Sequence, residues 1–165
     1  MPLNPSQEIG ENVMITDISQ LQSITPQQAK KIKSLRIENQ DINMDFLDFF
    51  LSLGDLDSLY FYRCEIYSAT LSCLNSAEKL GVVGCNLTSD LASSVLPIQR
   101  WDYIETLDLS HNKLALDPKQ FYDWLYHSII GAVSIGTIII SDNGFSEEWK
   151  DKIKSYFKNY TNVVV

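Results

Sequence analysis

The sequence predicts an α/β fold, with a parallel β-sheet on one face and helices on the other. Two observations predict this class. A short apolar frame recurs five times along the chain, and segments with helical spacing of apolar residues lie between its copies. Parallel strands need a crossover between them, and a helix is the usual crossover. The alternation therefore favours a parallel sheet with right-handed connections.

The recurring frame is clearest at Ile104, where apolar residues occupy positions 1, 4, 6 and 11 and Asn112 occupies position 9. The full copies begin at Ile32, Leu56, Ala77, Ile104 and Ile135, and partial copies lie at Val13 and Tyr160. Successive copies are 21 to 31 residues apart, measured between their position-4 residues. Positions 4 and 6 are two residues apart, so their side chains share one face of a strand, which we expect to be buried.

Position 9 lies where the chain leaves each strand and turns. A buried turn must satisfy its backbone N–H and C=O groups, and an asparagine amide can both donate and accept hydrogen bonds. We therefore expect the position-9 side chains to form a ladder; they are Gln40, Cys64, Cys85, Asn112 and Asn143. Gln40 is longer than the pattern requires, and a thiol is only a weak donor. We expect Cys64 and Cys85 to be buried thiols on adjacent rungs, with a disulfide or a metal site as the alternative.

Helical segments are expected between the strands. Thr25 and Pro26 are typical of a helix start, and Gly54 is typical of a helix end. Further helical segments are expected over residues 43–53, 68–74, 89–96 and 117–131. Ser146 is the expected N-cap of the last helix, since two glutamates follow it where the helix dipole favours negative charge. The buried stripe of that helix is expected to contain Trp149, Ile153, Tyr156 and Phe157.

The frame, written LxxLxLxx(N/C)xL, resembles that of the leucine-rich repeat family over nearly the whole chain. The resemblance implies a right-handed leucine-rich-repeat solenoid in the form of a horseshoe arc, with the parallel sheet on its concave face and the helices on its convex face. It implies one domain over residues 1–165, with about five full repeats, terminal partial repeats and a polar segment over residues 1–11. Spacers that are long enough for helices are similar to those of the intracellular type. The motif is specific for the fold and says almost nothing about the ligand.

Composition restricts the classes of function. The 165 residues are 45% hydrophobic, which is enough for one continuous core. The net charge of −8 disfavours binding to nucleic acid and to an anionic membrane surface. No apolar stretch is long enough for membrane insertion, and the N-terminal segment lacks a conventional secretory signal. We expect a cytoplasmic protein, or one delivered into a host cell by another secretion route, and the three cysteines fit a reducing compartment.

Motifs of catalysis and of cofactor binding are missing from the sequence. It contains no G-x-S-x-G, no phosphate-binding loop and no G-x-G-x-x-G, and its cysteines and two histidines lack zinc-ligand spacing. Asp108, Ser110 and His111 have the residue types of a catalytic triad, but neighbours in a strand point to alternate faces and do not align. We therefore expect no enzymatic activity, no cofactor and no metal.

The residues expected to point out of the sheet are candidates for partner binding. Since positions 4 and 6 point inward, positions 3, 5 and 7 point out of the concave face and position 8 lies at its margin. The candidate partner-binding residues are Arg36, Tyr60, Tyr62, Arg63, Lys79, Val83, Asp108, His111 and Ile139. Tyrosine and arginine are typical anchors of protein interfaces, and we expect Gly81 and Gly84 to open a shallow notch beside the tyrosines. The alternative interpretation is that exposed strand positions favour aromatic residues for sheet packing alone.

The sequence therefore predicts a monomeric protein–protein interaction module that binds a partner protein on its concave face. The resemblance implies two settings for it: an adaptor, or an effector that bacteria living inside host cells deliver into the host. The alternative is the substrate-recognition subunit of a larger enzyme complex, such as a ubiquitin ligase, with the enzyme on a separate chain. A third hypothesis is self-association through the edge strand that Val163, Val164 and Val165 form.

Overall fold

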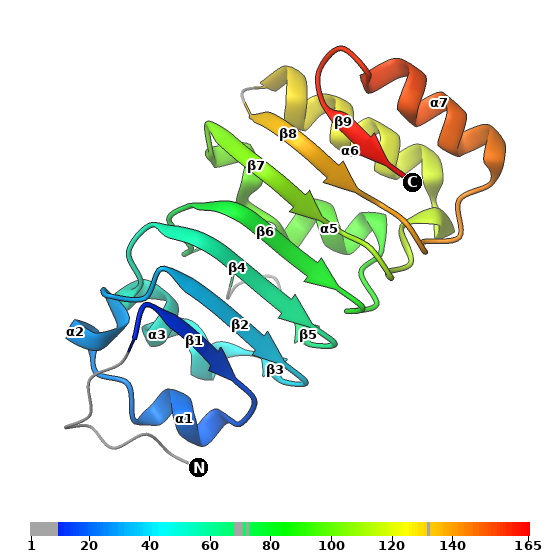
Figure 1. Ribbon diagram of the computed structural model, residues 1–165. Coiled ribbons are helices and arrows are strands. Elements are labelled where there is room, and N and C mark those ends of the chain that lie inside the picture. Colours follow the sequence, from blue (N-terminus) through cyan, green and yellow to red (C-terminus); the bar gives the residue numbers. More distant parts are fainter. Residues whose placement is uncertain (1–9, 68–70, 72, 132) are drawn as a thin grey trace.

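The computed structural model describes residues 10–67, 71, 73–131 and 133–165 and has mixed α/β structure. Within this part of the chain, seven strands form one parallel sheet and follow one another in chain order (Figure 1). The strands are β1 (Asn12–Ile15), β2 (Ser34–Glu38), β4 (Leu56–Tyr62), β6 (Ala77–Val83), β7 (Tyr103–Asp108), β8 (Ser134–Ile139) and β9 (Asn162–Val164). The predicted α/β class with a parallel sheet is confirmed.

The register of the strands follows the recurring frame. Each position-4 residue pairs with the position-4 residue of the next copy, without an offset. The resulting column across the sheet is Val13, Leu35, Leu59, Leu80, Leu107, Ile138 and Val163. A shift of one residue would turn every side chain of a strand to the opposite face, so this register determines which residues are buried.

The helices α3, α5, α6 and α7 lie on one face of the sheet, and no described element covers the opposite face (Figure 1). The helices are α1 (Ile18–Gln22), α2 (Pro26–Ala29), α3 (Leu47–Ser52), α5 (Ser89–Val95), α6 (Pro118–Gly131) and α7 (Glu147–Phe157), and the short 3-10 turns are η1 (Met44–Phe46), η2 (Pro97–Arg100) and η3 (Leu114–Leu116). A separate pair of parallel strands, β3 (Asp41–Ile42) and β5 (Glu65–Ile66), continues the chain beyond β2 and β4.

Most of the expected helices form. The segments expected over residues 89–96 and 117–131 are α5 and α6, and residues 43–53 form η1 followed by α3. The segment expected over residues 68–74 falls largely outside the described residues. Helix α1 was not predicted, although Asp17 and Gln20 have the spacing of a capping box: the Asp17 carboxylate accepts from Ser19 N, and Gln20 Oε1 accepts from Asp17 N.

Helix α7 begins at the predicted N-cap, but one residue of its predicted buried stripe is exposed. Ser146 Oγ accepts from Trp149 N at 3.3 Å, and Ile153 and Phe157 are buried. The prediction that Tyr156 is buried is wrong. Its ring lies on the outer surface, with its centroid 5.2 Å from that of Tyr122 in α6.

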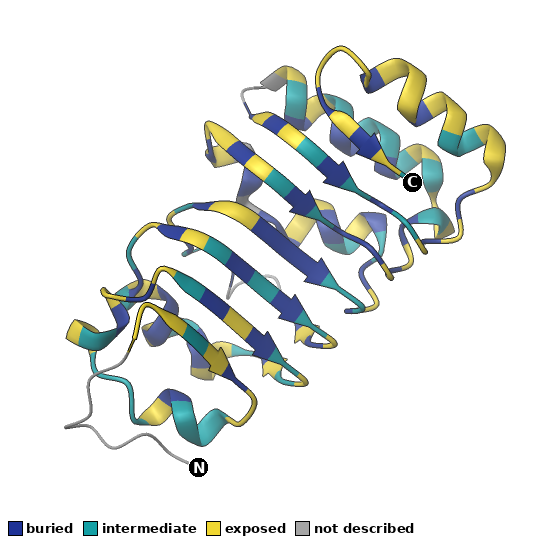
Figure 2. Ribbon diagram, viewed as in Figure 1, coloured by how far each residue is buried: buried dark blue, intermediate teal, exposed yellow. Residues whose placement is uncertain are grey.

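The inner face of the sheet and the helices share one apolar core. In the five full copies, every residue at positions 4 and 6 is buried. These residues alternate with more exposed ones along the strands in Figure 2, except in β6, where Gly81 between Leu80 and Val82 is also buried. The ring of Phe50 in α3 packs edge-on against that of Phe61 in β4, with centroids 6.1 Å apart. Phe121 of α6 and Phe157 of α7 are also fully buried. The predicted inward face is therefore confirmed.

The two position-9 asparagines form the hydrogen-bond ladder that the sequence predicts. Asn112 Oδ1 accepts from the N–H of Cys85 at 2.9 Å and of Leu87 at 3.0 Å. Asn112 Nδ2 donates to the carbonyl of Val82 at 2.6 Å in the preceding strand, and to that of Leu109 in its own copy. Asn143 repeats most of the arrangement one copy later: its Oδ1 accepts from Leu114 N, and its Nδ2 donates to Leu109 O and to Ile140 O.

The remaining rungs use weaker or longer groups. Cys85 Sγ donates to Phe61 O at 3.6 Å and accepts from Cys64 N at 3.4 Å, so it occupies the same place with sulfur in both roles. Cys64 Sγ lies 3.5 Å from Ile37 O. Gln40 Nε2 donates to Thr16 O at 2.8 Å, one residue further along the preceding copy than the carbonyl that Asn112 reaches. The longer side chain therefore moves this rung by one residue.

A repeated left-handed turn follows the strands, and the sequence pattern does not predict it. The position-8 residues of the five full copies all have φ between 53° and 64°: Asn39, Arg63, Gly84, His111 and Asp142. The N–H of each of the first four donates to the position-7 carbonyl of the next copy, as Arg63 N does to Val83 O at 3.0 Å. A side chain in this conformation costs about 1–2 kcal/mol, and glycine escapes that cost.

Replacement of Asn112 by alanine tests the ladder. The change leaves the N–H groups of Cys85 and Leu87 buried without their acceptor, so we expect Asn112→Ala to lower the free energy of unfolding by about 3 kcal/mol. Urea unfolding followed by circular dichroism measures the loss. Asn159→Ala, at an exposed position, is the control and should change the free energy by less than about 0.5 kcal/mol. Equal losses in the two variants would contradict the ladder.

A pair of glycine replacements tests the left-handed turn. Gly84 has a φ of 64°, and the nearest atom to an added Cβ would be Arg63 Cγ at 3.6 Å, so Gly84→Ala adds conformational strain without a clash. We expect a loss of about 1 kcal/mol in the free energy of unfolding. Gly54→Ala meets its nearest atom at 3.7 Å and requires no left-handed backbone, so it should not destabilise the protein. Indistinguishable midpoints for the two variants in urea would show that the turn carries no strain.

Candidate functional site

The face of the sheet opposite the helices, called the open face below, carries the candidate residues. Position 5 forms one row across it, in which Arg36 pairs with Tyr60, Tyr60 with Gly81, and Gly81 with Asp108. Position 7 forms a second row, in which Tyr62 pairs with Val83. Because the rows follow the register, residues far apart in the chain become neighbours here.

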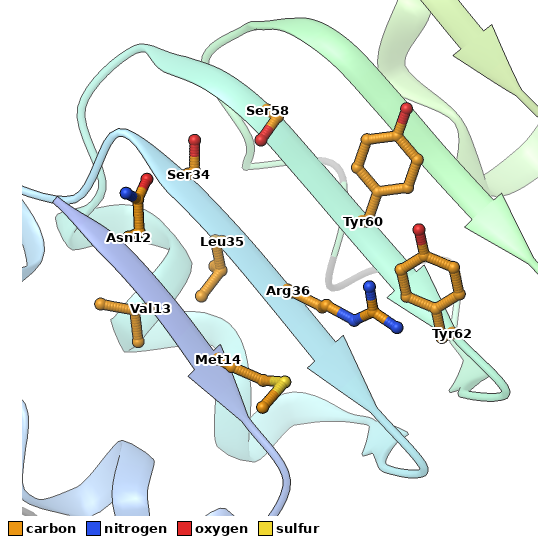
Figure 3. Close-up of a pocket in the computed structure, with 9 residues that line it drawn as sticks. All are labelled: Asn12, Val13, Met14, Ser34, Leu35, Arg36, Ser58, Tyr60 and Tyr62. Atoms are coloured by element: carbon orange, nitrogen blue, oxygen red, sulfur yellow. The ribbon is translucent and has the colours of Figure 1, made fainter.

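Tyr60 and Tyr62 form a stacked aromatic pair at the centre of the open face. Their ring centroids are 5.7 Å apart and their planes differ by 15°. The guanidinium carbon of Arg36 lies 4.0 Å from the centroid of Tyr62, so a cation covers one side of that ring (Figure 3). Arg36 is held in turn by the carboxylate of Glu38. The predicted cluster of Arg36, Tyr60 and Tyr62 is thus brought together by β2 and β4.

A groove of about 390 Å³ lies beside this aromatic pair and extends to the sheet edge at β1. Its lining residues are Asn12, Val13, Met14, Ser34, Leu35, Arg36, Ser58, Tyr60 and Tyr62 (Figure 3). The candidate residues named from the sequence do not include six of these, because none of the six is aromatic or charged: Asn12, Val13, Met14, Ser34, Leu35 and Ser58. The signal was present in the frame: Ser34 and Ser58 pair at position 3, where small side chains leave room beside the row that Met14, Arg36 and Tyr60 form.

The prediction that Gly81 opens a notch is wrong. The ring of Tyr60 lies directly over Gly81, and its Cγ is 2.8 Å from the place that a Cβ of Gly81 would take. Any side chain at position 81 would displace the ring, so the glycine allows Tyr60 to lie flat on β6. Gly81 is therefore buried beneath the aromatic pair instead of opening a hollow beside it.

Gly84 does border a hollow, at the margin of the open face. This second hollow has a volume of about 480 Å³ and is lined by Tyr62, Arg63, Val83, Gly84 and His111. Tyr62 lines both the groove and the hollow, so the two are adjacent. Four of the nine predicted residues meet in this hollow.

The other predicted residues are engaged or distant. The ammonium of Lys79 lies 3.8 Å from a carboxylate oxygen of Glu105. Asp108 accepts from the hydroxyl of Ser110 at 2.6 Å. Ile139 pairs with Asp108 and lies three strands from Tyr60, roughly 14 Å at the usual strand spacing. Ile139 is therefore not part of the tyrosine cluster.

Burial affects the acidity of the tyrosines. It raises the pKa of Tyr60 above its usual value, and the negative charge of Asp108 raises that pKa further. Burial also raises the pKa of Tyr62, although Arg36 opposes the increase. Both phenols are therefore protonated at neutral pH and can donate and accept hydrogen bonds at the rim of the groove.

The two ladder cysteines are free and buried, as predicted. Burial raises the pKa of the Cys85 thiol to about 11 and also raises that of Cys64. Among the described residues, no group of three or more histidine, cysteine, aspartate or glutamate side chains is placed to hold a metal ion. In the same residues, no helix has the length and apolar character needed to cross a membrane.

Comparison of the chain with models of known protein families, with curated proteins and with solved structures finds no match. The geometry of the open face therefore carries the functional argument.

Alkylation rates test the burial of the ladder thiols. With a pKa of about 11, Cys85 is a thiolate in roughly one molecule in a thousand at about pH 8, and only the thiolate reacts. We expect iodoacetamide to modify the partly exposed Cys73 first, and to modify Cys64 and Cys85 only in denaturant, as measured by peptide mass spectrometry. Rapid modification of Cys85 in the folded protein would contradict its placement in the ladder.

Proposed function

We propose that the chain is a right-handed leucine-rich-repeat solenoid whose open face is the concave, protein-binding surface. Three observations support the fold assignment: strands that follow chain order, position-4 residues that pair without an offset, and position-9 side chains that bond to the preceding copy. Each is what a stack of similar repeats requires, because every repeat must bury its apolar face against its neighbours.

The observation that carries the functional proposal is the stacked pair of Tyr60 and Tyr62 on an uncovered sheet face. Tyrosine offers a large contact area at low cost in side-chain entropy, and it is enriched where single residues dominate binding. The pair is pre-ordered, since Tyr60 lies on Gly81 and Tyr62 is covered by Arg36. A rigid aromatic platform beside a groove loses little freedom when a partner binds.

Packing within the sheet leaves part of each tyrosine ring uncovered. The sheet is buried from its other side by the core, and both rings remain partly exposed on the open face. Met14 is more than half exposed at the far side of the groove, so the apolar lining extends beyond the two rings. We therefore infer that the groove and the platform together bind an apolar segment of a partner protein.

Removal of both rings tests the proposal. We expect Tyr60→Ala with Tyr62→Ala to reduce recovery of the partner at least about ten-fold in quantitative affinity capture, since anchor residues of interfaces typically contribute 2 kcal/mol or more. The control is Tyr67→Ala with Tyr160→Ala, which removes two exposed tyrosines outside the seven-stranded sheet.

The single variant Tyr62→Ala leaves the Tyr60–Gly81 contact intact and separates binding from folding. Native circular dichroism and an unchanged urea midpoint are required of each variant before recoveries are compared. The proposal would be refuted if wild type, Tyr62→Ala and the double variant of Tyr60 and Tyr62 all recovered the partner equally.

A further inference from the structure

Charge pairing on the open face leaves one cation without an acidic neighbour. Two of its cationic side chains each face a carboxylate, in the pairs Arg36–Glu38 and Lys79–Glu105, and the imidazole of His111 faces Asp142. Arg63 makes no ion pair or hydrogen bond through its side chain to any residue that the structure describes. Its guanidinium is therefore available to a ligand.

The backbone directs Arg63 along the margin of the sheet. Arg63 has a φ of 53°, and its Cγ lies 3.6 Å from the place that a Cβ of Gly84 would take. The aliphatic stem of Arg63 therefore lies beside Gly84, the residue that follows β6. The missing side chain at position 84 gives the guanidinium this path and leaves the hollow beside it open.

The lining of the hollow combines one unpaired cation with apolar surface. Val83 and the ring of Tyr62 provide the apolar part, Gly84 exposes backbone, and Arg63 and His111 stand at the rim. A guanidinium presents parallel N–H donors that match the two oxygens of a carboxylate. An aliphatic residue next to that carboxylate would lie against Val83 and Tyr62.

We propose that the partner segment presents an acidic and an apolar side chain on the same face, with the carboxylate bound to Arg63 and the apolar side chain against Val83 and Tyr62. This inference rests on the proposed function and specifies the partner's chemistry. The net charge of −8 repels a uniformly acidic partner, so the acidic group is a local feature of the segment. One unpaired guanidinium matches the single charge of a carboxylate; a phosphate dianion would need a second cation, and His111 already faces Asp142.

Defined peptides test the proposal. The probe is a short, blocked, fluorescein-labelled peptide in which leucine and glutamate alternate at every second position with serine between them, so that both types face the same way in an extended chain. It is compared with peptides in which glutamine or lysine replaces glutamate. Fluorescence anisotropy with the full chain should give a Kd for the glutamate peptide about ten-fold lower than for the glutamine peptide, because hydrogen bonds to charged groups are stronger. Added salt should reduce this difference, and the lysine peptide should bind most weakly.

Variants of the arginine assign the preference to one side chain. Arg63→Gln keeps an unbranched side chain at the left-handed position and removes the charge, so the glutamate and glutamine peptides should bind it equally. Arg63→Lys keeps the charge without the paired donors and should give an intermediate preference. Arg100→Gln in η2 removes the same charge away from the seven-stranded sheet and should bind as wild type does.

The outcomes separate this inference from the proposed function. Equal binding of the three peptides, the absence of binding to any of them, or an undiminished preference in Arg63→Gln would overturn the inference. For a captured partner, loss on replacement of Tyr60 and Tyr62 with unchanged affinity for Arg63→Gln would overturn the inference and leave the proposed function standing. If the double variant of Tyr60 and Tyr62 still bound the captured partner as wild type does, the proposed function itself would be overturned.

Discussion

The buried turn after each strand is the constraint on which the rest of the structure depends. At that point the chain leaves the sheet inside the core, where its N–H and C=O groups have no water to bond. Asn112 meets the need with one amide that joins its own turn to the copy before it. Because these bonds join Asn112 to fixed positions of the preceding copy, the turn also sets the register, and the register decides which side chains face outward.

The rungs of the ladder differ in strength along the sheet. Asn112 and Asn143 use short amide bonds, whereas Cys64 and Cys85 rely on sulfur contacts of 3.3 to 3.6 Å. The thiol rungs terminate β4 and β6, the strands that carry the tyrosine pair and the glycine beneath it. The candidate surface therefore lies where the ladder is weakest, and where local opening of the turns requires the least free energy.

The sequence predicted the strands, the inward face and the ladder because each depends on spacing alone. The capping box of Asp17 and Gln20 also has a spacing that the sequence shows, so α1 was predictable although the frame does not mark it. The left-handed position 8 was missed although four of its five residues, Asn39, Gly84, His111 and Asp142, are of types enriched in that conformation. Only Arg63 is an unfavourable type there. The groove and the position of Tyr60 over Gly81 depend on side-chain rotamers, which no periodic pattern specifies.

The groove and the second hollow share Tyr62, and this determines the form of a segment that would fill both. The groove begins at Val13 on β1 and the hollow ends at His111 beyond β7, so the surface crosses four strand spacings. That distance is roughly 19 Å, which about six residues in extended conformation span. A helix would need about twice as many residues to cover it. An extended segment places alternate side chains on the open face, and an apolar residue in the groove with an acidic residue near Arg63 fits that alternation.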